Sequence, residues 1–404
     1  MTPQGRFVAL TALRWIPAGL TIPVTVLFAL DRGLTLPEVG IAFSIQGFVV
    51  LVLELPSGAL ADSWGRRPVL LLASSVSLVA AVLLVFAHSL PVFITVYAIQ
   101  GVFRALDSGV LEAWFADAAI ATGIAGSLER GLAAAGTALG LAIGGGAISS
   151  SGLVLLAPLL GLDPLALPIA VSAFFVAVYL VAVLRLVRDD PTASVSADWR
   201  SAFRAIPAEL AAGVRLLGAS RILAVIVAVE LFWGFGMVAF ETFTPVRLSE
   251  VIGDSAVAAT TMGPVTAAGW LLFAAGSALA GRLGVDAALI AALLRILQGA
   301  TVVVLGLAAG AVGVIAGFLA CYAVHGASNP PHNTLLHRQV TGSNRATVLS
   351  LNSMVGQPAG AFGSLVLGGL AGAASVSTAI VTGGVVLAAA APLYLWVWAR
   401  TRRP

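Results

Sequence analysis

Ionisable and polar side chains interrupt four of the long apolar runs of this sequence at helical spacing. Most of them are separated by three, four or seven positions, which places the members of each run on one face of a helix. Charged groups are costly inside a nonpolar medium, so each of them is a functional hypothesis. The four sets are Arg14, Thr21 and Thr25; Arg104, Asp107, Ser108 and Leu111, with Glu112 about 80° from Arg104; Glu230, Trp233, Gly234, Met237 and Glu241; and Cys321, His325, Ser328 and His332.

Glu230 is the carboxylate best suited to carrying a proton. It lies near the middle of its run and has no basic residue three or four positions away. Because a low dielectric disfavours the charged form of a carboxyl group, we expect Glu230 to bind and release protons near neutral pH. The further candidates for proton coupling are Asp107, Glu112 and Glu54.

Several of these residues also have a purely structural interpretation. Arg104 and Asp107, at positions i and i+3, would neutralise each other. Glu112 would serve as a structural partner for Arg14. Glu241 lies near the end of its run, where water could solvate it. Both kinds of interpretation stay open at this point.

The two histidines, His325 and His332, are expected to be polar groups rather than proton relays. No carboxylate stands near them at ligand spacing, so we predict no metal site. The sequence contains no lysine and therefore no GxxxxGKS or GxxxxGKT phosphate-binding loop, which excludes ATP-driven activity within this chain. Other enzyme signatures are absent as well, and we predict no catalytic residue, no cofactor and no enzymatic function.

A short polar hairpin between two apolar runs is the second stretch with chemistry. It reads Gly-Ala-Leu-Ala-Asp-Ser-Trp-Gly-Arg-Arg-Pro over residues 58–68. Gly65 can adopt the positive φ that a tight turn after a helix needs. Arg66 and Arg67 resist translocation and thereby place the hairpin in the cytoplasm.

Membrane-spanning helices are the elements that must position these groups. The chain is 59% hydrophobic and 10% charged, with a mean hydropathy of +1.04, which is too apolar for a soluble domain. A bilayer core of about 30 Å needs about 20 apolar residues in a helix. The runs of this length are Phe7–Leu30, Val39–Ala61, Val69–Ala87, Val92–Ala116, Gly131–Ser149, Ala166–Leu186, Ile222–Val246, Ala256–Ala280, Ala287–Leu307, Val312–Leu335, Ala346–Gly369 and Val376–Ala399.

A polar connector, Val187–Arg221, divides these runs into two sets of six. We therefore predict an N-terminal six-helix bundle over residues 1–186, a cytoplasmic linker over 187–221 and a C-terminal six-helix bundle over 222–404. Within the linker, apolar residues recur every three to four positions, which is typical of a helix lying on the membrane surface.

The distribution of arginine predicts the orientation. With the N-terminus inside, sixteen arginines fall in cytoplasmic segments and only two, Arg32 and Arg247, in outer loops. We therefore predict that both termini are cytoplasmic and that the number of spans is even. The net charge of +3 does not indicate nucleic-acid binding, because the arginines form no continuous basic tract.

An internal repeat points to two similar halves. A shift of 219 residues lays 59–65 over 278–284, so that each half has a hairpin between its second and third spans. Two six-span halves in the same orientation suit a pair of bundles related by an axis along the membrane normal, with a central cavity.

The hairpin resembles the signature loop of the major facilitator superfamily, G-x-L-A-D-x-x-G-R-R, although Ser63 stands where many members carry a basic residue. Spans, orientation, repeat and central loop agree, so the resemblance covers nearly the whole chain. Residues 54–58, Glu-Leu-Pro-Ser-Gly, and 108–114, Ser-Gly-Val-Leu-Glu-Ala-Trp, resemble a drug-exporter-like branch. The resemblance implies an all-α membrane protein with twelve transmembrane helices in two pseudo-symmetric six-helix bundles.

The resemblance also implies residue roles. Asp62 would sit against the N-terminus of the eleventh span and hold the cytoplasmic side shut, within a conformational latch made of Gly58, Asp62, Gly65, Arg66 and Arg67. The setting of Glu54 suggests a buried packing or latch role. Spans one, four, seven and ten would line the cavity, which makes its substrate candidates Arg14, Thr21, Arg104, Trp233, Met237, Glu241, His325 and His332.

The function implied is that of a secondary transporter of a bacterial cytoplasmic membrane, working by alternating access. We expect a monomeric proton-coupled antiporter that exports a small, partly apolar drug, antibiotic or metabolite, with a role in multidrug resistance. Its expected partners are the small molecule, protons and the lipid bilayer. One alternative is proton-coupled or facilitative uptake of a metabolite. Another, from a different class, is a non-transporting membrane sensor or assembly partner on the same scaffold.

Overall fold

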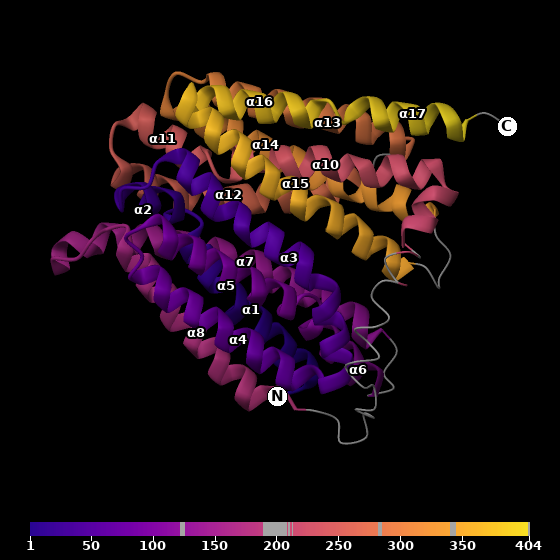
Figure 1. Cartoon of the computed structure of the whole chain (residues 1–404), viewed down its shortest axis with the longest axis horizontal. Coiled ribbons are helices and arrows are strands. Elements are labelled where there is room, and N and C mark those ends of the chain that lie inside the picture. The colour runs from indigo at the N-terminus through magenta and orange to yellow at the C-terminus, as the bar shows by residue number, and fades with distance from the viewer. Residues whose placement is uncertain are drawn as a thin grey trace. The chain divides into compact units, whose positions relative to one another are not determined.

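The computed structural model describes residues 1–121, 126–188, 208, 211, 213–281, 285–339 and 345–402, apart from a few side chains inside helices. Every regular element in these residues is a helix (Figure 1). The predicted all-α fold is therefore confirmed. Most of the predicted linker lies outside the described residues, although 213–219 are helical.

Eleven helices of the described residues are long and apolar enough to cross a membrane, or up to twelve if one bent pair forms a single span. The bent pair is α1, Pro3–Thr21, with α2, Thr25–Asp31, which meet at an angle of 43°. Each predicted apolar run falls on one of these helices or on the bent pair. The chain is thus a multi-pass membrane protein.

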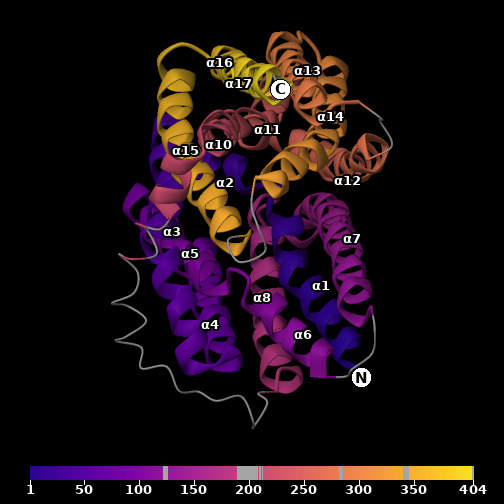
Figure 2. The same cartoon turned by 90° about the vertical axis from the view of Figure 1, so that its right-hand side faces the viewer.

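Contacts divide the chain into two units, and unit 1 comprises residues 1–33, 49–207 and 259–267. In it, α1 packs against α7 and α8 (Figure 2). Its core includes the stacked rings of Phe7 and Phe115, whose centroids are 4.3 Å apart. Its helices, beyond α1 and α2, are α4 (Arg66–Val85), α5 (Leu90–Asp107), α6 (Val110–Ala121), α7 (Ser127–Leu156), the short 3₁₀ helix η1 (Ala157–Leu160) and α8 (Ala166–Leu186).

Unit 2 comprises residues 34–48, 208–258 and 268–404. In it, α10 packs against α15 and α16, and α13 packs against α14, α16 and α17. Tyr394, Leu335 and Ile226 belong to its buried core. Its helices are α10 (Arg221–Glu241), α11 (Thr244–Ile252), α13 (Ala287–Leu307), α14 (Ala311–Arg338), α15 (Arg345–Ala373), α16 (Val376–Ala388) and α17 (Ala391–Thr401).

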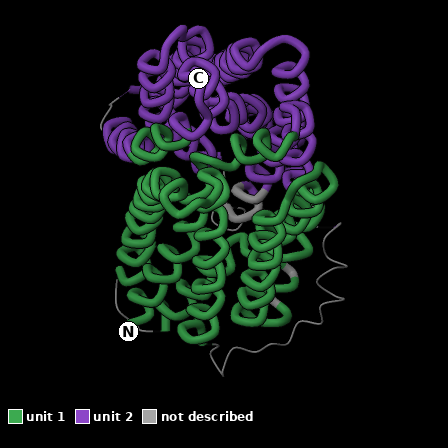
Figure 3. Tube along the Cα trace, turned by 90° about the vertical axis from the view of Figure 1, so that its left-hand side faces the viewer, with its two compact units in different colours: residues 1–33, 49–207, 259–267 green, residues 34–48, 208–258, 268–404 purple. Residues whose placement is uncertain are grey.

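Two long helices are shared between the units (Figure 3). The first part of α3, Leu36–Trp64, belongs to unit 2, where Gly40 lies so close to α15 that an added Cβ would be 2.3 Å from the Ser364 carbonyl oxygen. The middle of α12, Ser255–Ala280, belongs to unit 1, where the Ser151 hydroxyl donates a hydrogen bond to the Thr260 carbonyl. The predicted division into bundles over residues 1–186 and 222–404 remains a proposal. By contacts, residues 34–48 group with the second half of the chain and residues 259–267 with the first.

Several helices begin at side chains that cap their free N–H groups. Thr2 accepts a hydrogen bond from the Gly5 amide, and Ser375 accepts one from Thr378. Asp254 and Asp286 cap α12 and α13 in the same way. Such caps satisfy donors that would otherwise be orphaned at the helix end, and in sequence they mark where an apolar run becomes a helix.

Two of the predicted spans are not single regular helices. The first is bent at Ile22–Val24, where Pro23 supplies no amide hydrogen for the helical ladder. The fourth is interrupted between α5 and α6, where Ser108 is extended and Gly109 has φ +71°. The predicted common face of Asp107, Ser108 and Leu111 therefore does not exist as one helical face, because the helical repeat does not continue across the interruption.

Candidate functional site

Unit 1 holds an ionic cluster built on α1, α5 and α6. Arg14 Nη2 pairs with Asp107 Oδ2, and Arg14 Nη1 lies 3.4 Å from Glu112 Oε1. The Asp107 side chain is only 2% exposed, whereas that of Glu112 is 46% exposed. One guanidinium thus compensates two carboxylates, and the predicted pairing of Glu112 with Arg14 is observed.

The break in the fourth span presents polar groups at this cluster. Arg104, Ser108 and Gly109 are exposed, while Asp107 between them is buried. Arg104 interacts electrostatically with Glu54, Asp107 and the like charge of Arg14. Asp107 forms its salt bridge with Arg14 on α1, and the mutual neutralisation of Arg104 and Asp107 remains a prediction. Both residues belong to the last turn of α5, which ends at Asp107.

Thr21 has a local structural role. Its hydroxyl donates hydrogen bonds to the carbonyls of Pro17 and Ala18, at 2.9 and 3.2 Å. Its own carbonyl accepts a hydrogen bond from Thr25 at 2.7 Å. These bonds satisfy backbone groups where α1 ends and the chain bends, which is what a short hydroxyl side chain can do in a membrane.

Unit 2 brings together two residues that the sequence places 102 positions apart. Glu230 Oε1 on α10 lies 3.1 Å from His332 Nε2 on α14. Both side chains are buried, 10% and 6% exposed. The Asn352 side-chain oxygen on α15 is 3.3 Å from the same histidine nitrogen. A carboxylate paired with an imidazole can change its number of bound protons without leaving either group isolated.

The pair continues into a hydrogen-bonded chain across three helices. His332 Nδ1 is 2.7 Å from the Tyr394 hydroxyl on α17. Tyr394 in turn interacts with the guanidinium of Arg295 on α13. Arg295 Nη1 donates to Gln298 Oε1 at 2.6 Å, and Gln298 Nε2 is 3.4 Å from His325 Nδ1. A continuous polar path thus runs from Glu230 to His325 inside unit 2.

His325 sits among aromatic rings. Trp233 stacks on it at 5.8 Å between centroids, and Phe240 and Phe273 lie at 5.8 and 5.2 Å. Close by, the Tyr322 hydroxyl donates to Glu241 Oε1 at 2.6 Å. Glu241 is therefore bonded to protein, and the expectation that water alone solvates it is wrong.

The predicted faces of α10 and α14 meet at three levels. Glu230 contacts His332, Trp233 contacts His325, and Glu241 contacts Tyr322 beside Cys321. Met237 lies half-buried on α10 in the same interval. The sequence periodicity thus selected two helix faces that turn toward each other.

Several members of this site were missed in the sequence, and they are Arg295, Tyr394, Gln298, Asn352 and Tyr322. Arg295 is 2% exposed and lies inside an apolar run, so the cost of a buried charge, which singled out Arg14 and Arg104, also applies to it. Tyr394 gave no such signal, because a tyrosine in a terminal span is ordinary near the membrane interface.

The hairpin keeps its turn where predicted. Gly65 precedes α4 with φ +92°, which confirms the expected positive φ. Arg66 Nε is 3.8 Å from Asp117 on α6, and Arg67 donates to the Leu184 carbonyl at 3.2 Å.

The latch itself remains a prediction. Gly58 is exposed on α3, with open space around it. The side chains of Asp62 and of the first residues of α15 lie outside the described residues.

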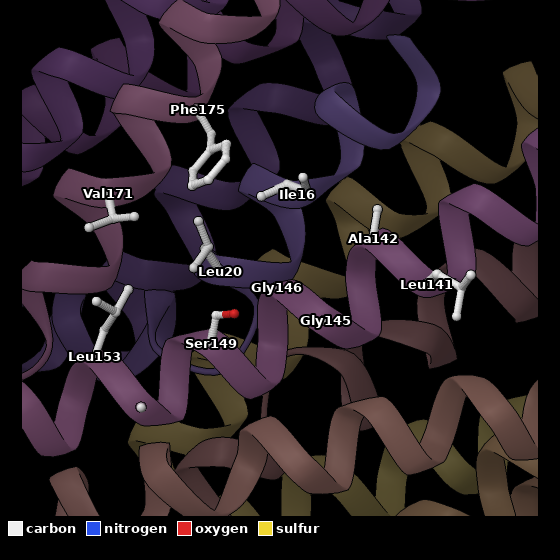
Figure 4. Close-up of a pocket in the computed structure, with 11 residues that line it drawn as sticks. Ile16, Leu20, Leu141, Ala142, Gly145, Gly146, Ser149, Leu153, Val171 and Phe175 are labelled. Atoms are coloured by element: carbon white, nitrogen blue, oxygen red, sulfur yellow. The ribbon is translucent and has the colours of Figure 1, made fainter. Parts of the chain in front are cut away.

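A separate apolar groove of about 470 Å³ lies on unit 1 between α1, α7 and α8 (Figure 4). Ile16, Leu20 and Phe175 point toward it, and Ser149 offers the one hydroxyl among its lining residues. None of the predicted site residues lines it, so it provides no group for proton chemistry. Among the described residues no group of three or more His, Cys, Asp or Glu side chains could hold a metal ion.

The fold has many counterparts among solved structures. They include the nucleoside transporter NupG, with 13% identity, a TM-score of 0.77 and all of both chains covered. A bacterial homolog of the human lysosomal transporter Spinster has 13% identity and a TM-score of 0.77, covering 98% of this chain and 96% of that one. The human organic anion transporter MFSD10 has 18% identity and a TM-score of 0.63, covering 98% and 100%.

At these identities the likeness establishes the fold, and no curated protein matches the sequence. The family profile described as Major Facilitator Superfamily matches residues 7–364, which is most of the chain. The buried ionisable groups described above thus lie in a chain that belongs to the Major Facilitator Superfamily and is a membrane transporter of that type.

Proposed function

We propose that this transporter exports a small, partly apolar compound in exchange for protons, by alternating access, across a bacterial cytoplasmic membrane with both termini inside. The drug-exporter-like segments at 54–58 and 108–114 support the export direction. On this proposal the chain acts as a monomer and contributes to multidrug resistance. Transport is its activity, and it catalyses no chemical reaction.

The buried Glu230–His332 pair carries the proposal. A carboxylate in a membrane span is expensive unless it is neutralised or paired. Here the partner is an imidazole 3.1 Å away. An imidazole can be neutral, so the Glu230 carboxylate beside it can take up and release a proton, whereas a guanidinium would hold the carboxylate permanently charged. Glu230 is thus the residue best placed to load a proton on one side and release it on the other.

The ionic cluster of unit 1 bears on the charge of the substrate. Arg14 is compensated by Asp107 and partly by Glu112. The half-exposed Glu112 remains accessible beside the helix break, as does the exposed Arg104. With Glu54, which interacts with Arg104, the cluster contains three carboxylates and two guanidinium groups, so we favour a neutral or cationic substrate over an anionic one.

The test uses energised everted membrane vesicles and a panel of lipophilic fluorescent cations. The wild type should accumulate a cation and release protons in exchange. Glu230→Gln should lose uphill accumulation while retaining downhill exchange, because glutamine keeps the hydrogen bond to His332 but cannot carry a proton. Glu250→Gln is the matched control. The Glu250 side chain is 42% exposed and pairs with Arg247, so this substitution should leave transport unchanged.

The remaining outcomes separate the alternatives. Accumulation in right-side-out but not in everted vesicles would establish uptake. Absence of any substrate-dependent proton movement across the panel would favour a non-transporting role. Undiminished proton coupling in Glu230→Gln would remove that residue from the mechanism.

A further inference from the structure

The hydrogen-bond partners of His332 determine where the Glu230–His332 pair can bind a proton. Nε2 of His332 faces two acceptors, Glu230 Oε1 at 3.1 Å and Asn352 Oδ1 at 3.3 Å. Nδ1 faces the Tyr394 hydroxyl at 2.7 Å. In a neutral imidazole one nitrogen donates and the other accepts, and the neighbours of each nitrogen select which is which.

Tyr394 is placed between an imidazole and a group that can only donate. The guanidinium of Arg295 has five N–H donors and no acceptor. When Arg295 donates to the Tyr394 oxygen, His332 Nδ1 is the acceptor that the described residues offer to the tyrosine proton. If Nδ1 carried a hydrogen, the hydroxyl would receive two donors, and its own proton would lose the acceptor that it has among the described residues. Arg295 thus disfavours both the Nδ1–H tautomer and the imidazolium.

We infer that Arg295 and Tyr394 are positioning residues that fix His332 as a neutral Nε2–H donor and so leave Glu230 as the sole proton carrier of the pair. The donors then run in one direction: Arg295 to Tyr394, Tyr394 to His332, and His332 to Glu230. This inference deepens the proposed function and rests on it for the role of Glu230.

The second oxygen of Glu230 is where the carried proton would reside. Oε2 lies toward α15, 3.3 Å from the position that a Cβ on Gly356 would take, and away from the oxygen that faces His332. A proton arriving from water binds Oε2 and leaves from it, while His332 continues to donate to Oε1. One proton is gained and lost, and the tautomer of His332 does not change.

The ionisable groups that face the pair can be named helix by helix. Tyr394 comes from α17 and Arg295 from α13, and Asn352 from α15 does not titrate. His325 on α14 is separated from the pair by Gln298 and Arg295. The sequence of α16 contains no ionisable residue, and that of α15 contains only Arg345, at its first position.

The test reads the tautomer directly, without a substrate. The full chain, labelled with ¹⁵N-histidine and placed in lipid nanodiscs, is measured by NMR between about pH 5 and 8. The chain has four histidines, and His332→Gln identifies the signal of interest. The wild type should show neutral His332 with hydrogen on Nε2 throughout this range.

Two substitutions at Arg295 form a matched pair. Arg295→Lys keeps a donor-only cation and should preserve the Nε2–H form. Arg295→Gln supplies an amide oxygen that can accept the tyrosine proton, so the Nδ1–H and imidazolium forms should rise about three- to tenfold, the effect of one hydrogen bond. If Arg295→Gln does not fold, Tyr394→Phe provides the same test by removing the partner of Nδ1.

An Nδ1–H or imidazolium form in the wild type would overturn the inference, as would an Arg295→Gln or Tyr394→Phe spectrum identical to that of the wild type. Failure of the proposed function is a separate result. The tautomer could be fixed as described while Glu230→Gln retains full proton coupling in vesicles, and in that case the positioning holds but the carrier lies elsewhere.

Discussion

The two units solve the same problem, a carboxylate inside a membrane helix, in different ways. In unit 1 the carboxylate of Asp107 is paired with Arg14, a cation that does not deprotonate in proteins. In unit 2 the carboxylate of Glu230 is paired with His332, an imidazole, which is a group that can exist with or without a charge. The first arrangement holds a fixed charge, and the second is the one at which we propose that a proton binds and leaves.

The helices that carry the two clusters also differ, because one is broken and the other is continuous. The fourth span is broken at Ser108–Gly109 beside Asp107, and polar groups are exposed there. The corresponding tenth span, α14, continues as one helix through Pro330 and Pro331. A broken span offers backbone and side-chain polar groups to a ligand, whereas a continuous helix holds a hydrogen-bonded chain in register. We therefore propose that the substrate contacts chiefly the break and that protons exchange chiefly at the hydrogen-bonded chain.

Arg14→Gln should produce the largest loss of stability. It leaves Asp107, whose side chain is 2% exposed, without its charge partner. Breaking a buried pair in this way costs about 3 to 5 kcal/mol of unfolding free energy. Denaturation of the purified protein in micelles measures the loss. The double variant Arg14→Gln with Asp107→Asn should recover most of it, because no isolated charge remains. A double variant as unstable as the single one would show that the pair acts through packing and not through charge.

Much of this contrast could be predicted from the sequence, because apolar length and helical period are local properties. The spans follow from the length of the apolar runs, and the faces of α10 and α14 follow from helical spacing. The turn at Gly65 follows from the glycine in the polar hairpin. The partner of each charge does not follow, since it depends on which helices become neighbours. Asp107 is three residues from Arg104 in sequence but pairs with Arg14, which is 93 positions away.

The interruption of the fourth span could not be read from apolar length. Ser108 and Gly109 are tolerated inside many membrane helices, so neither marks a break without its neighbours. Arg295 was within reach of the same rule that selected Arg14 and Arg104, whereas its link to Tyr394 and His332 required the packing of three helices. Sequence thus identifies costly residues more readily than the network that compensates for them.

Gly109→Ala should have an intermediate effect that tests the break. Gly109 has φ +71°, a left-handed conformation that costs an alanine about 1 to 2 kcal/mol, and no heavy atom lies within 4 Å of an added Cβ. The expected loss is therefore conformational and not steric. Gly140→Ala on α7 is the control, since its surroundings are also open but its backbone is helical. It should be neutral or slightly stabilising. Equal stability of the two variants would indicate that the break can close into a regular helix.

Glu112→Gln should have the smallest effect on stability and thereby separate the two carboxylates of unit 1. Its oxygen lies 3.4 Å from Arg14, and its side chain is 46% exposed, so water screens the pair. The expected loss in unfolding free energy is below about 1 kcal/mol, compared with about 3 to 5 for Arg14→Gln. Uptake of lipophilic cations by everted vesicles should nevertheless fall clearly although the protein remains stable, because the accessible carboxylate beside the break is lost. Normal transport by Glu112→Gln would show that Glu112 does not contact the substrate. A loss of stability as large as that of Arg14→Gln would show that Glu112 belongs to the buried pair.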